Sequence, residues 1–411
     1  MNPTVSHPAP IGDDFERLNP RVEAMCDLYP PPGRTRFTTD LAAVALRGSG
    51  LTEEESSWLA DQSRAAGFII SKTQTGVRIE GSSDALAMGF AAWVDREPAS
   101  PSCPGRTLGR VLSTALIAAS RRARIVPTAH DLEFRIGGGP PVVMGVLNLT
   151  PDSFSDGGDF ADVPAAIAHA KRMIEEGATI IDVGGESTRP GADPVDAAAE
   201  QDRVLPVIEA LAKTDAVRSG ATFISIDTTK ATVADAALEA GAHIVNDITA
   251  LRDPAMAEVA AAHGAALVLM HMQGDPRTMQ KKPVYDEVVD DVLAALRQAF
   301  GRAVAGGVSP SRVLVDPGIG FGKNLPQNLT LLQRLPELRS LGAPILLGAS
   351  RKSFIGKITG ETDPVKRLPG SLAVAALATT EGIEVLRVHD VAETIQAART
   401  AYAVHHGGDS F

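Results

Sequence analysis

Residues 142–158 read VVMGVLNLTPDSFSDGG, and this stretch decides how the rest of the chain is interpreted. It opens with an apolar, valine-rich run that is long enough for a buried strand and too short for a helix. The run ends at the polar residue Asn148, and the following Thr150-Pro151-Asp152-Ser153 is typical of an irregular loop. A buried strand that carries an amide side chain into a polar loop is typical of the functional end of a barrel.

The same strand pattern recurs along the last two-thirds of the chain, with alanine- and glutamate-rich helical stretches between the strands, such as 164–176 and 230–240. The apolar runs are 142–147, 179–183, 222–226, 243–245, 265–270, 312–315, 344–347 and 384–386. Eight strand-then-helix units predict an α/β fold, a (β/α)8 TIM barrel. A doubly wound open sheet is the alternative, which eight such units disfavour.

The region before the barrel has a different character. We expect a small α+β N-terminal region, residues 1–130, ordered over about 51–125 and followed by the barrel at 131–411. It contains a predicted helix over 52–66, a hairpin over 67–80, a second helix ending near residue 93 and a linker over 97–107. No catalytic constellation lies there, so we expect either a packing or oligomerisation module or an addition without a catalytic role. The run GGGPP at 137–141 also predicts a hairpin between 132–136 and 142–146.

The composition restricts the classes of protein and partner. Apolar residues make up 44% of the 411 residues, and acidic residues exceed basic ones by 50 − 39 = 11, so we expect a globular protein that binds neither nucleic acid nor membrane. Two cysteines form neither a disulfide framework nor a metal knuckle. The first 30 residues lack a signal-peptide pattern, and no apolar run has the roughly 20 residues of a membrane span. We therefore expect a cytoplasmic location.

Each apolar run ends in a polar or charged residue. These are Asn148, Glu186, Asp227, Asn246 with Asp247, His271, Asp316, Ser350 with Arg351 and Lys352, and Arg387 with His389. In a parallel barrel these positions lie on one face. Any one of them alone is more often a helix cap or turn residue, and capping remains an alternative for Asp227, Asp316 and His389. Eight in series favour a binding site.

The chemistry of these residues divides them into two groups. Asp227, Asn246, Asp316 and Lys352 offer donors and acceptors to a flat, polar heterocycle such as a pterin or a purine.

The second group is built around Arg387 and His389, which are two residues apart at a strand end and make a cradle for an anion such as a phosphate. Asn148 lies on the adjacent strand once the barrel closes, and its amide oxygen with a diphosphate suits Mg²⁺.

Two long polar loops, 149–163 and 186–196, are typical of lids over a site. The run GIGFGK at 318–323 is not a dinucleotide fingerprint, because it follows Asp316-Pro317. We expect Phe321 to form the wall of a pocket for a small flat ring.

At this point the motifs resemble one family, dihydropteroate synthase, the sulfonamide-inhibited transferase of the folate pathway. The matching segments are MGVLNLTPDSFSDGG, DVGGESTRPGA, SIDTTK, AHIVNDI, LMHMQGDPRTMQ, LVDPGIGFGKN, GASRKSFIG, RLPGSLA and RVHDV. They occur in the family's order over about residues 132–405. The resemblance implies condensation of 6-hydroxymethyl-7,8-dihydropterin diphosphate with p-aminobenzoate, giving 7,8-dihydropteroate and diphosphate. It also implies a homodimer formed through late barrel helices.

The resemblance also implies roles for individual residues. Asp227, Asn246, Asp316 and Lys352 resemble the pterin-binding set, which Met270 lines. Asn148 resembles the magnesium ligand, and Thr188, Arg387 and His389 resemble the diphosphate contacts. Phe154, Pro190, Phe321 and Ser350 resemble the wall of the aminobenzoate pocket. Arg189 resembles the loop arginine that closes over the site.

Two other functions remain open at this point. A pterin-dependent methyltransferase acting with a corrinoid partner would use the same pterin slot, but it has no need of the Arg387–His389 cradle. A non-catalytic pterin-binding protein would have no need of the lid motifs.

Overall fold

A computed structural model of the chain describes residues 124–149, 163–187, 194–274, 279 and 283–407, together with the backbone of three strands nearer the N-terminus. The chain divides into two compact units. One comprises Met1–Arg122 with Gln333–Gly342, and the other comprises Ala123–Leu332 with Ala343–Phe411. The second unit carries all the motifs described above.

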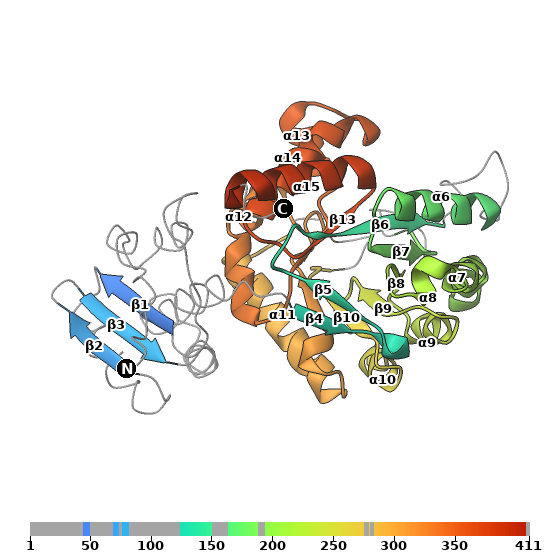
Figure 1. Ribbon diagram of the computed structural model, residues 1–411, viewed down its shortest axis with the longest axis horizontal. Helices are drawn as coiled ribbons and strands as arrows, with labels where there is room; N and C mark the ends of the chain where they lie inside the picture. The colour runs from blue at the N-terminus through green and yellow to red at the C-terminus, as the bar shows by residue number, and fades with distance from the viewer. Residues whose placement is uncertain are drawn as a thin grey trace, which may run out of the picture. The chain divides into compact units, whose positions relative to one another are not determined.

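The first unit contains a three-stranded antiparallel sheet (Figure 1). Its strands are β1 (Val44–Ser49), β2 (Ile69–Thr73) and β3 (Gly76–Gly81), with β3 paired to both of the others. The hairpin expected over 67–80 is therefore present as β2 and β3. The helices expected over 52–66 and up to residue 93 lie outside the described residues.

The second unit is a closed barrel of eight parallel strands (Figure 1). The strands are β6 (Val142–Asn148), β7 (Ile180–Gly184), β8 (Phe223–Asp227), β9 (Ile244–Asp247), β10 (Ala266–Met270), β11 (Val313–Asp316), β12 (Leu346–Leu347) and β13 (Val385–Val388). Strand β13 pairs with β6, and a parallel bridge between Val315 and Ile345 joins β11 to the chain entering β12. The predicted TIM barrel is confirmed.

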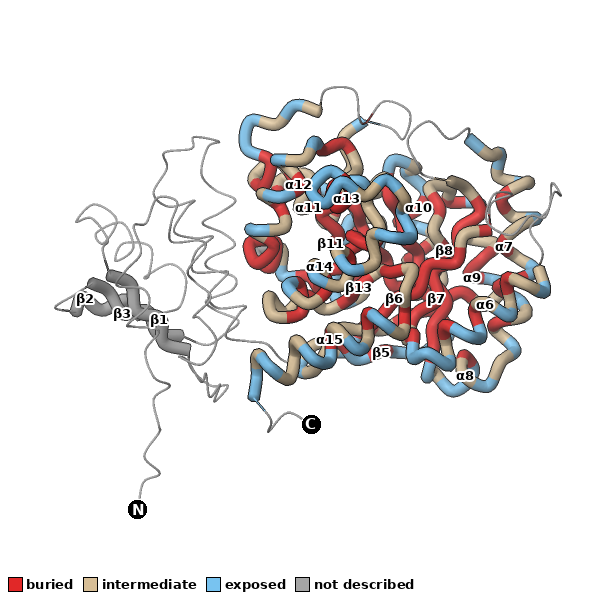
Figure 2. Tube along the Cα trace, turned by 90° about the horizontal axis from the view of Figure 1, so that it is seen from above, coloured by how far each residue is buried: buried red, intermediate tan, exposed pale blue. Residues whose placement is uncertain are grey.

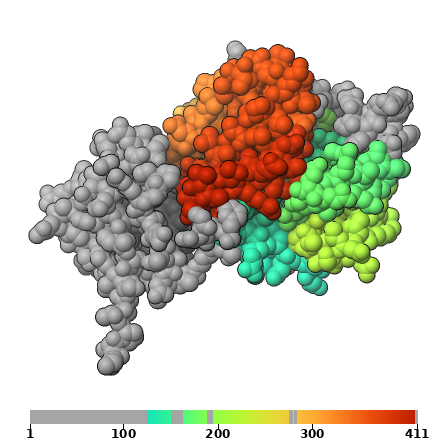
Figure 3. Space-filling view, turned by 45° about the horizontal axis from the view of Figure 1, so that its top comes forward, coloured from blue at the N-terminus to red at the C-terminus, as the bar shows by residue number. Residues whose placement is uncertain are grey.

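Helices surround the barrel and bury their inner faces against the strands, as Figure 2 shows for the red, buried segments. They are α6 (Val163–Glu175), α7 (Ala197–Ala212), α8 (Asp215–Arg218), α9 (Ala231–Glu239), α10 (Met256–Ala262), α11 (Val288–Ala305), α12 (Leu325–Gln333), α13 (Ser353–Thr359), α14 (Leu368–Thr380) and α15 (Val391–His406). In Figure 3 the surface of the C-terminal helices, in red, continues into that of α6, in green, as expected when the last barrel unit meets the first. Within the described part of the chain, no helix has the length and apolarity of a membrane span.

An antiparallel hairpin of β4 (Arg124–Pro127) and β5 (Glu133–Ile136) closes the N-terminal end of the barrel. Its residues Val126, Phe134 and Ile136 pack with the inward-facing residues of the strands in one buried core. The hairpin predicted between 132–136 and 142–146 is thus wrong. Strand β6 is paired on both sides by β7 and β13 and has no free edge for β5.

Candidate active site

The polar residues converge on the barrel interior because side chains alternate along a strand. Ile180 and Ile244 belong to the interior core, so Asp182 and Asn246, two residues later, face the same interior closer to the carboxyl ends. The same alternation applies to the other strands. The inward residues at this end are Asn148, Asp182, Asp227, Asn246, Met270, Asp316 and Arg387.

Arg387 is the centre of this cluster. Its Nε donates to Oδ2 of Asp182 at 2.6 Å, and one terminal nitrogen donates to Oδ2 of Asp227, also at 2.6 Å. The same Asp182 oxygen accepts from Nδ2 of Asn246 at 3.1 Å. Strands β7, β8, β9 and β13 are therefore connected by one buried polar network.

Burial and ion pairing shift the pKa values of these two groups in opposite directions. Burial raises the pKa of Asp227 to about 7, although the guanidinium of Arg387 acts in the opposite direction. For Arg387 itself burial lowers the pKa, but the carboxylates of Asp182 and Asp227 outweigh it and the net shift is upward. Arg387 thus stays charged, while Asp227 exchanges its proton near neutral pH.

A second group forms around Asp316 and Lys352. Oδ1 of Asp316 accepts from the backbone N–H of Gly318 at 2.6 Å, and burial raises the pKa of this carboxyl against the effect of Lys352. Burial lowers the pKa of Lys352 to about 8, opposed by Asp316. The Lys352 Nζ donates to the carbonyl of Ile319 and lies 4.3 Å from the centroid of the Phe321 ring, a cation–π contact. Phe321 is therefore held against the same lysine that faces Asp316.

Ser350 and His389 are joined by hydrogen bonds. Ser350 Oγ lies 3.1 Å from Nδ1 of His389 and accepts from the His389 backbone N–H at 3.3 Å. The two segments that carry them are also joined by a two-point ion pair between the next residues, Arg351 and Asp390, in which Nε donates to Oδ2 at 2.9 Å. The turn after β12 and the end of β13 thus present one joint surface.

Asn148 lies at the carboxyl end of β6, half-buried, beside the backbone of Gly184. A Cβ on Gly184 would lie 3.8 Å from Oδ1 of Asn148 and 3.5 Å from Cβ of Asp227. The glycine therefore leaves space between the two side chains. Within the described ranges, the Asn148 amide forms no side-chain hydrogen bond, and no cluster of three histidine, cysteine or acidic residues is arranged to hold a metal.

Comparison with known proteins agrees with this geometry. The family model described as "Pterin binding enzyme" matches residues 144–389, which is more than half of the chain. Dihydropteroate synthase from Escherichia coli K12 is 48% identical over 263 residues, covering 64% of this chain and 91% of the relative. The chain belongs to the dihydropteroate synthase family. A family member from Synechocystis is 47% identical over 263 residues, covering 64% of this chain and 89% of the relative.

Solved structures of dihydropteroate synthases have the same barrel. The Yersinia pestis synthase in complex with a sulfonamide drug aligns at a TM-score of 0.63 with 45% identity, covering 68% of this chain and 99% of that one. The Xanthomonas albilineans synthase in complex with 7,8-dihydropteroate aligns at 0.60 with 41% identity, covering 68% and 100%. Members of this dihydropteroate synthase family are enzymes of the transferase class, and this chain is one of them.

In this synthase neither Asp227 nor Asp316 caps the helix that follows its strand. The N–H of Ala231, at the start of α9, donates to Oδ2 of Asp253 at 2.9 Å, so Asp227 does not cap that helix. Asp316 accepts from Gly318 within its own turn. For His389, the N-cap residue of α15 is Asp390, which makes no side-chain cap bond.

Several other polar strand ends have structural partners. Asp247 accepts from the backbone N–H groups of Thr249 at 2.8 Å and Leu251 at 2.6 Å, and so holds the turn after β9. His271 pairs with a buried lysine, Lys323. The predicted set of eight polar strand ends therefore mixes site residues with residues that fix loops.

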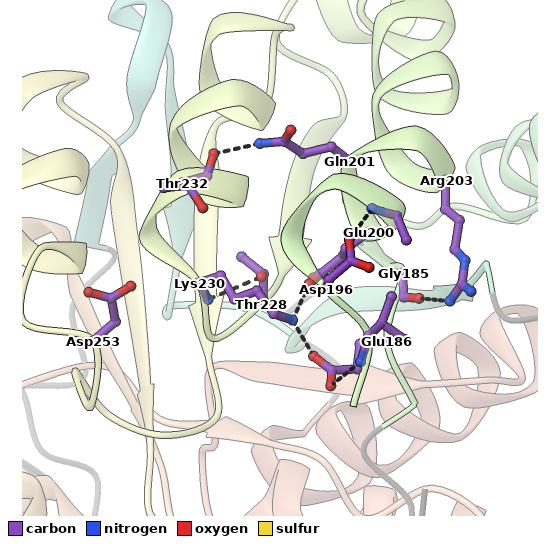
Figure 4. A network of polar contacts seen from close by, with 12 residues as sticks. Gly185, Glu186, Asp196, Glu200, Gln201, Arg203, Thr228, Lys230, Thr232 and Asp253 are labelled. Atoms are coloured by element: carbon purple, nitrogen blue, oxygen red, sulfur yellow. Dashed lines mark hydrogen bonds and ion pairs between the residues drawn. The ribbon is translucent and has the colours of Figure 1, made fainter. Parts of the chain in front are cut away.

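Glu186 belongs to a network at the start of the second predicted lid loop (Figure 4). Lys230 Nζ lies 2.5 Å from Oε2 of Glu186 and 2.5 Å from Oε2 of Glu200, and the N–H of Val195 donates to Oε1 of Glu186 at 3.1 Å. Both ends of the loop are thereby tied to α9. The loop residues Thr188, Arg189 and Pro190, and Phe154 of the other loop, lie outside the described residues.

Sequence reasoning missed two residues, Asp182 and Lys323. Asp182 stands inside an apolar run, TIIDVGG, where a buried strand has no ordinary place for a charge. Lys323 ends the glycine run at 318–323 and is 2% exposed. An acidic residue in the middle of a buried strand was the available signal for Asp182. Nothing local distinguishes Lys323 from a solvated lysine.

Proposed function

We propose that the synthase activity of this chain joins p-aminobenzoate to 6-hydroxymethyl-7,8-dihydropterin diphosphate and releases 7,8-dihydropteroate and diphosphate. One observation supports this above the others. Carboxylates and an amide that suit a pterin edge meet a guanidinium at one rim of the barrel. The complexes of relatives with a sulfonamide and with 7,8-dihydropteroate agree with it.

For the pterin ring, we assign the contacts to Asp227, Asn246, Asp316 and Lys352, with Met270 lining the slot. An ionised carboxylate accepts from an amino group and a ring N–H together, and an amide both donates and accepts. Asp227 and Asp316 also favour positive charge on the ring. A cation that develops at the pterin methylene is therefore stabilised by groups that are already in place.

For the diphosphate, we assign the contacts to Arg387 and His389, with Thr188 from the loop. The guanidinium has five N–H donors, of which Asp182 and Asp227 each take one, so 5 − 2 = 3 remain for phosphate oxygens. These donors offset the charge that collects on the leaving group.

The reaction then needs little proton chemistry from the protein. The methylene C–O bond breaks and its electron pair leaves with the diphosphate. The lone pair of the aniline nitrogen forms the new C–N bond, and that nitrogen loses a proton to the released diphosphate. An aniline nitrogen is neutral at pH 7, so no strong general base is required. The two predicted lids would exclude water, which otherwise captures the cation.

We assign a magnesium ion to Asn148. A half-buried amide oxygen at the end of β6 suits an ion that retains several waters and takes few protein ligands. When bound there with the diphosphate, the ion would supply further neutralisation of the leaving group.

For p-aminobenzoate, we assign the pocket to Phe321, Ser350, Phe154 and Pro190, with Arg189 closing over it. The same pocket should bind sulfonamides, and the Yersinia pestis relative is known in complex with a sulfonamide drug. Further, we propose a cytoplasmic homodimer formed through α14 and α15, where Leu377 and Val404 are exposed. For the residues before the barrel unit we propose a packing or oligomerisation role without catalytic groups.

The test is an assay of the purified chain with both substrates and Mg²⁺, measuring diphosphate and dihydropteroate together. We expect equal amounts of the two products. Arg387→Ala should weaken binding of the pterin diphosphate by about 2 kcal/mol or more, because it removes a charged hydrogen-bond donor. Arg218→Ala, exposed on α8 and outside the helices proposed for the dimer, is the matched control. Unchanged turnover in Arg387→Ala would remove the proposed diphosphate role.

A further inference from the structure

The loop over residues 318–323, which carries Phe321, is held by side chains at nearly every position. Asp316 binds the N–H of Gly318, and Asn328 Oδ1 accepts from the N–H of Gly320 at 2.7 Å. The hydroxyl of Tyr285 donates to the carbonyl of Gly322 at 2.7 Å. This loop is therefore a built platform with a fixed backbone.

The same loop packs closely against the backbone that follows β10. Gly318 has φ +66°, and a Cβ there would lie 1.9 Å from the carbonyl oxygen of His271. Gly322 has φ +62°, and its Cβ would lie 2.6 Å from the carbonyl oxygen of Gln273. Only glycine combines this left-handed backbone with this close approach. Small displacements of the loop are thus resisted on this side.

Lys323 joins these two segments. Its Nζ lies 2.9 Å from each of three acceptors, the carbonyls of Gly318 and Phe321 and Nδ1 of His271, and 3.3 Å from the carbonyl of His271. Three contacts at this distance match the three donors of an ammonium group. Lys352 binds the carbonyl of Ile319 in the same loop.

Stability alone does not explain a lysine at this position. Lys323 is 2% exposed, and among the described residues it forms no ion pair. Burial lowers its pKa well below the usual range, opposed by Asp316. Burying an amine among neutral acceptors costs its hydration, and only the hydrogen bonds to those acceptors offset that cost. The gain must lie in what the lysine holds in place.

We infer that Lys323 is a positioning residue for the second substrate: by binding the carbonyls of Gly318 and Phe321 and the ring of His271, it sets the place of the Phe321 ring that receives p-aminobenzoate. This inference rests on the proposed function of Phe321. Lys323 touches neither substrate and acts only through the loop.

The experiment is a steady-state comparison of Lys323→Met with the native full-length chain, varying each substrate in turn. Met keeps the apolar stem and removes all the donors. We expect the KM for p-aminobenzoate to rise about tenfold or more, with the KM for the pterin diphosphate changed by less than about threefold. Gln327→Ala is the matched control, because Gln327 bonds to Asn324 and Pro283 and leaves 318–321 untouched.

The outcomes separate this inference from the proposed function. If the native chain forms no dihydropteroate, the proposed function fails. If the native chain is active and Lys323→Met lowers only kcat, or raises both KM values equally, Lys323 is merely structural and the inference is overturned. Should Lys323→Met not fold, Lys323→Gln, which keeps two donors, is subjected to the same comparison. Failure of both variants to fold would also assign the lysine to stability.

Discussion

At the scale of single residues, the site depends on charges whose protonation is set by burial. Asp227 is the clearest case, since burial raises the pKa of its carboxyl to about 7 while Arg387, 2.6 Å away, favours the ionised form. A carboxylate accepts two N–H groups of a pterin edge, and a protonated carboxyl does so poorly. Recognition of the ring should therefore depend on pH in the neutral range.

We predict that affinity for the pterin without its diphosphate increases as pH rises from about 5.5 to 7.5 and levels off above the pKa of Asp227. In Asp227→Asn the affinity should be lower by about tenfold at pH 7.5, and it should depend less steeply on pH, because the amide does not titrate while Asp316 and Lys352 still do. Calorimetric titration with 6-hydroxymethyl-7,8-dihydropterin across this range is the measurement. An equally steep dependence in the variant would show that another group titrates.

At the scale of elements, the loop between β7 and α7 is anchored by a small network of ion pairs. No local sequence pattern predicts this network. Glu200 on α7 is fully buried, and its Oε2 pairs with Lys230 at the start of α9, while Oε1 has no hydrogen-bond partner within the described part of the chain. Lys230 also pairs with Glu186, directly after β7. One lysine thus joins two consecutive β/α units at the functional end of the barrel.

Removal of that lysine leaves the buried Glu200 carboxylate without compensation. We predict that Lys230→Met lowers the free energy of unfolding by about 3 kcal/mol. Gln201→Ala is the control, because Gln201 on the same helix makes one exposed hydrogen bond to the carbonyl of Thr232 and its loss should have almost no effect. Urea unfolding measures both. Equal stability of Lys230→Met and the native chain would contradict an uncompensated charge at Glu200.

At the scale of the whole molecule, the barrel has to be closed both around its circumference and at its N-terminal end. The bridge between Val315 and Ile345 completes the circumference, and the β4–β5 hairpin covers the N-terminal end. Strand β4 begins at Arg124, before the predicted start of the barrel at residue 131. The compact barrel unit accordingly begins at Ala123.

Two truncations test how far the barrel extends. We predict that a chain starting at residue 123 keeps a higher urea midpoint than one starting at 128, which lacks β4. Loss of β4 removes the buried Val126 and the partner of β5, a change that should cost about 2 kcal/mol or more. Identical midpoints for the two truncations would show that β4 contributes nothing to the barrel.

Much of this architecture could be predicted from sequence, because its signals are local. Apolar runs with intervening helical stretches identify all eight barrel strands within one or two residues, and the polar residue after each run marks the functional end. Asp227, Asn246 and Asp316 could be singled out because they lie at or next to the ends of predicted strands, and Lys352 because it follows the next predicted strand, just before α13.

The tertiary structure decided which side chains and which strands pair with each other. Asp182 and Arg387 are 205 residues apart in the chain, but their side chains are 2.6 Å apart in the barrel. The contact between Lys323 and His271 joins residues that are 52 positions apart. The hairpin error has the same origin: β5 pairs with β4 because β6 already has two neighbours in the barrel. Periodicity in a sequence reports which side of an element is buried. Which buried groups then meet depends on how the barrel closes, and no local pattern contains that information.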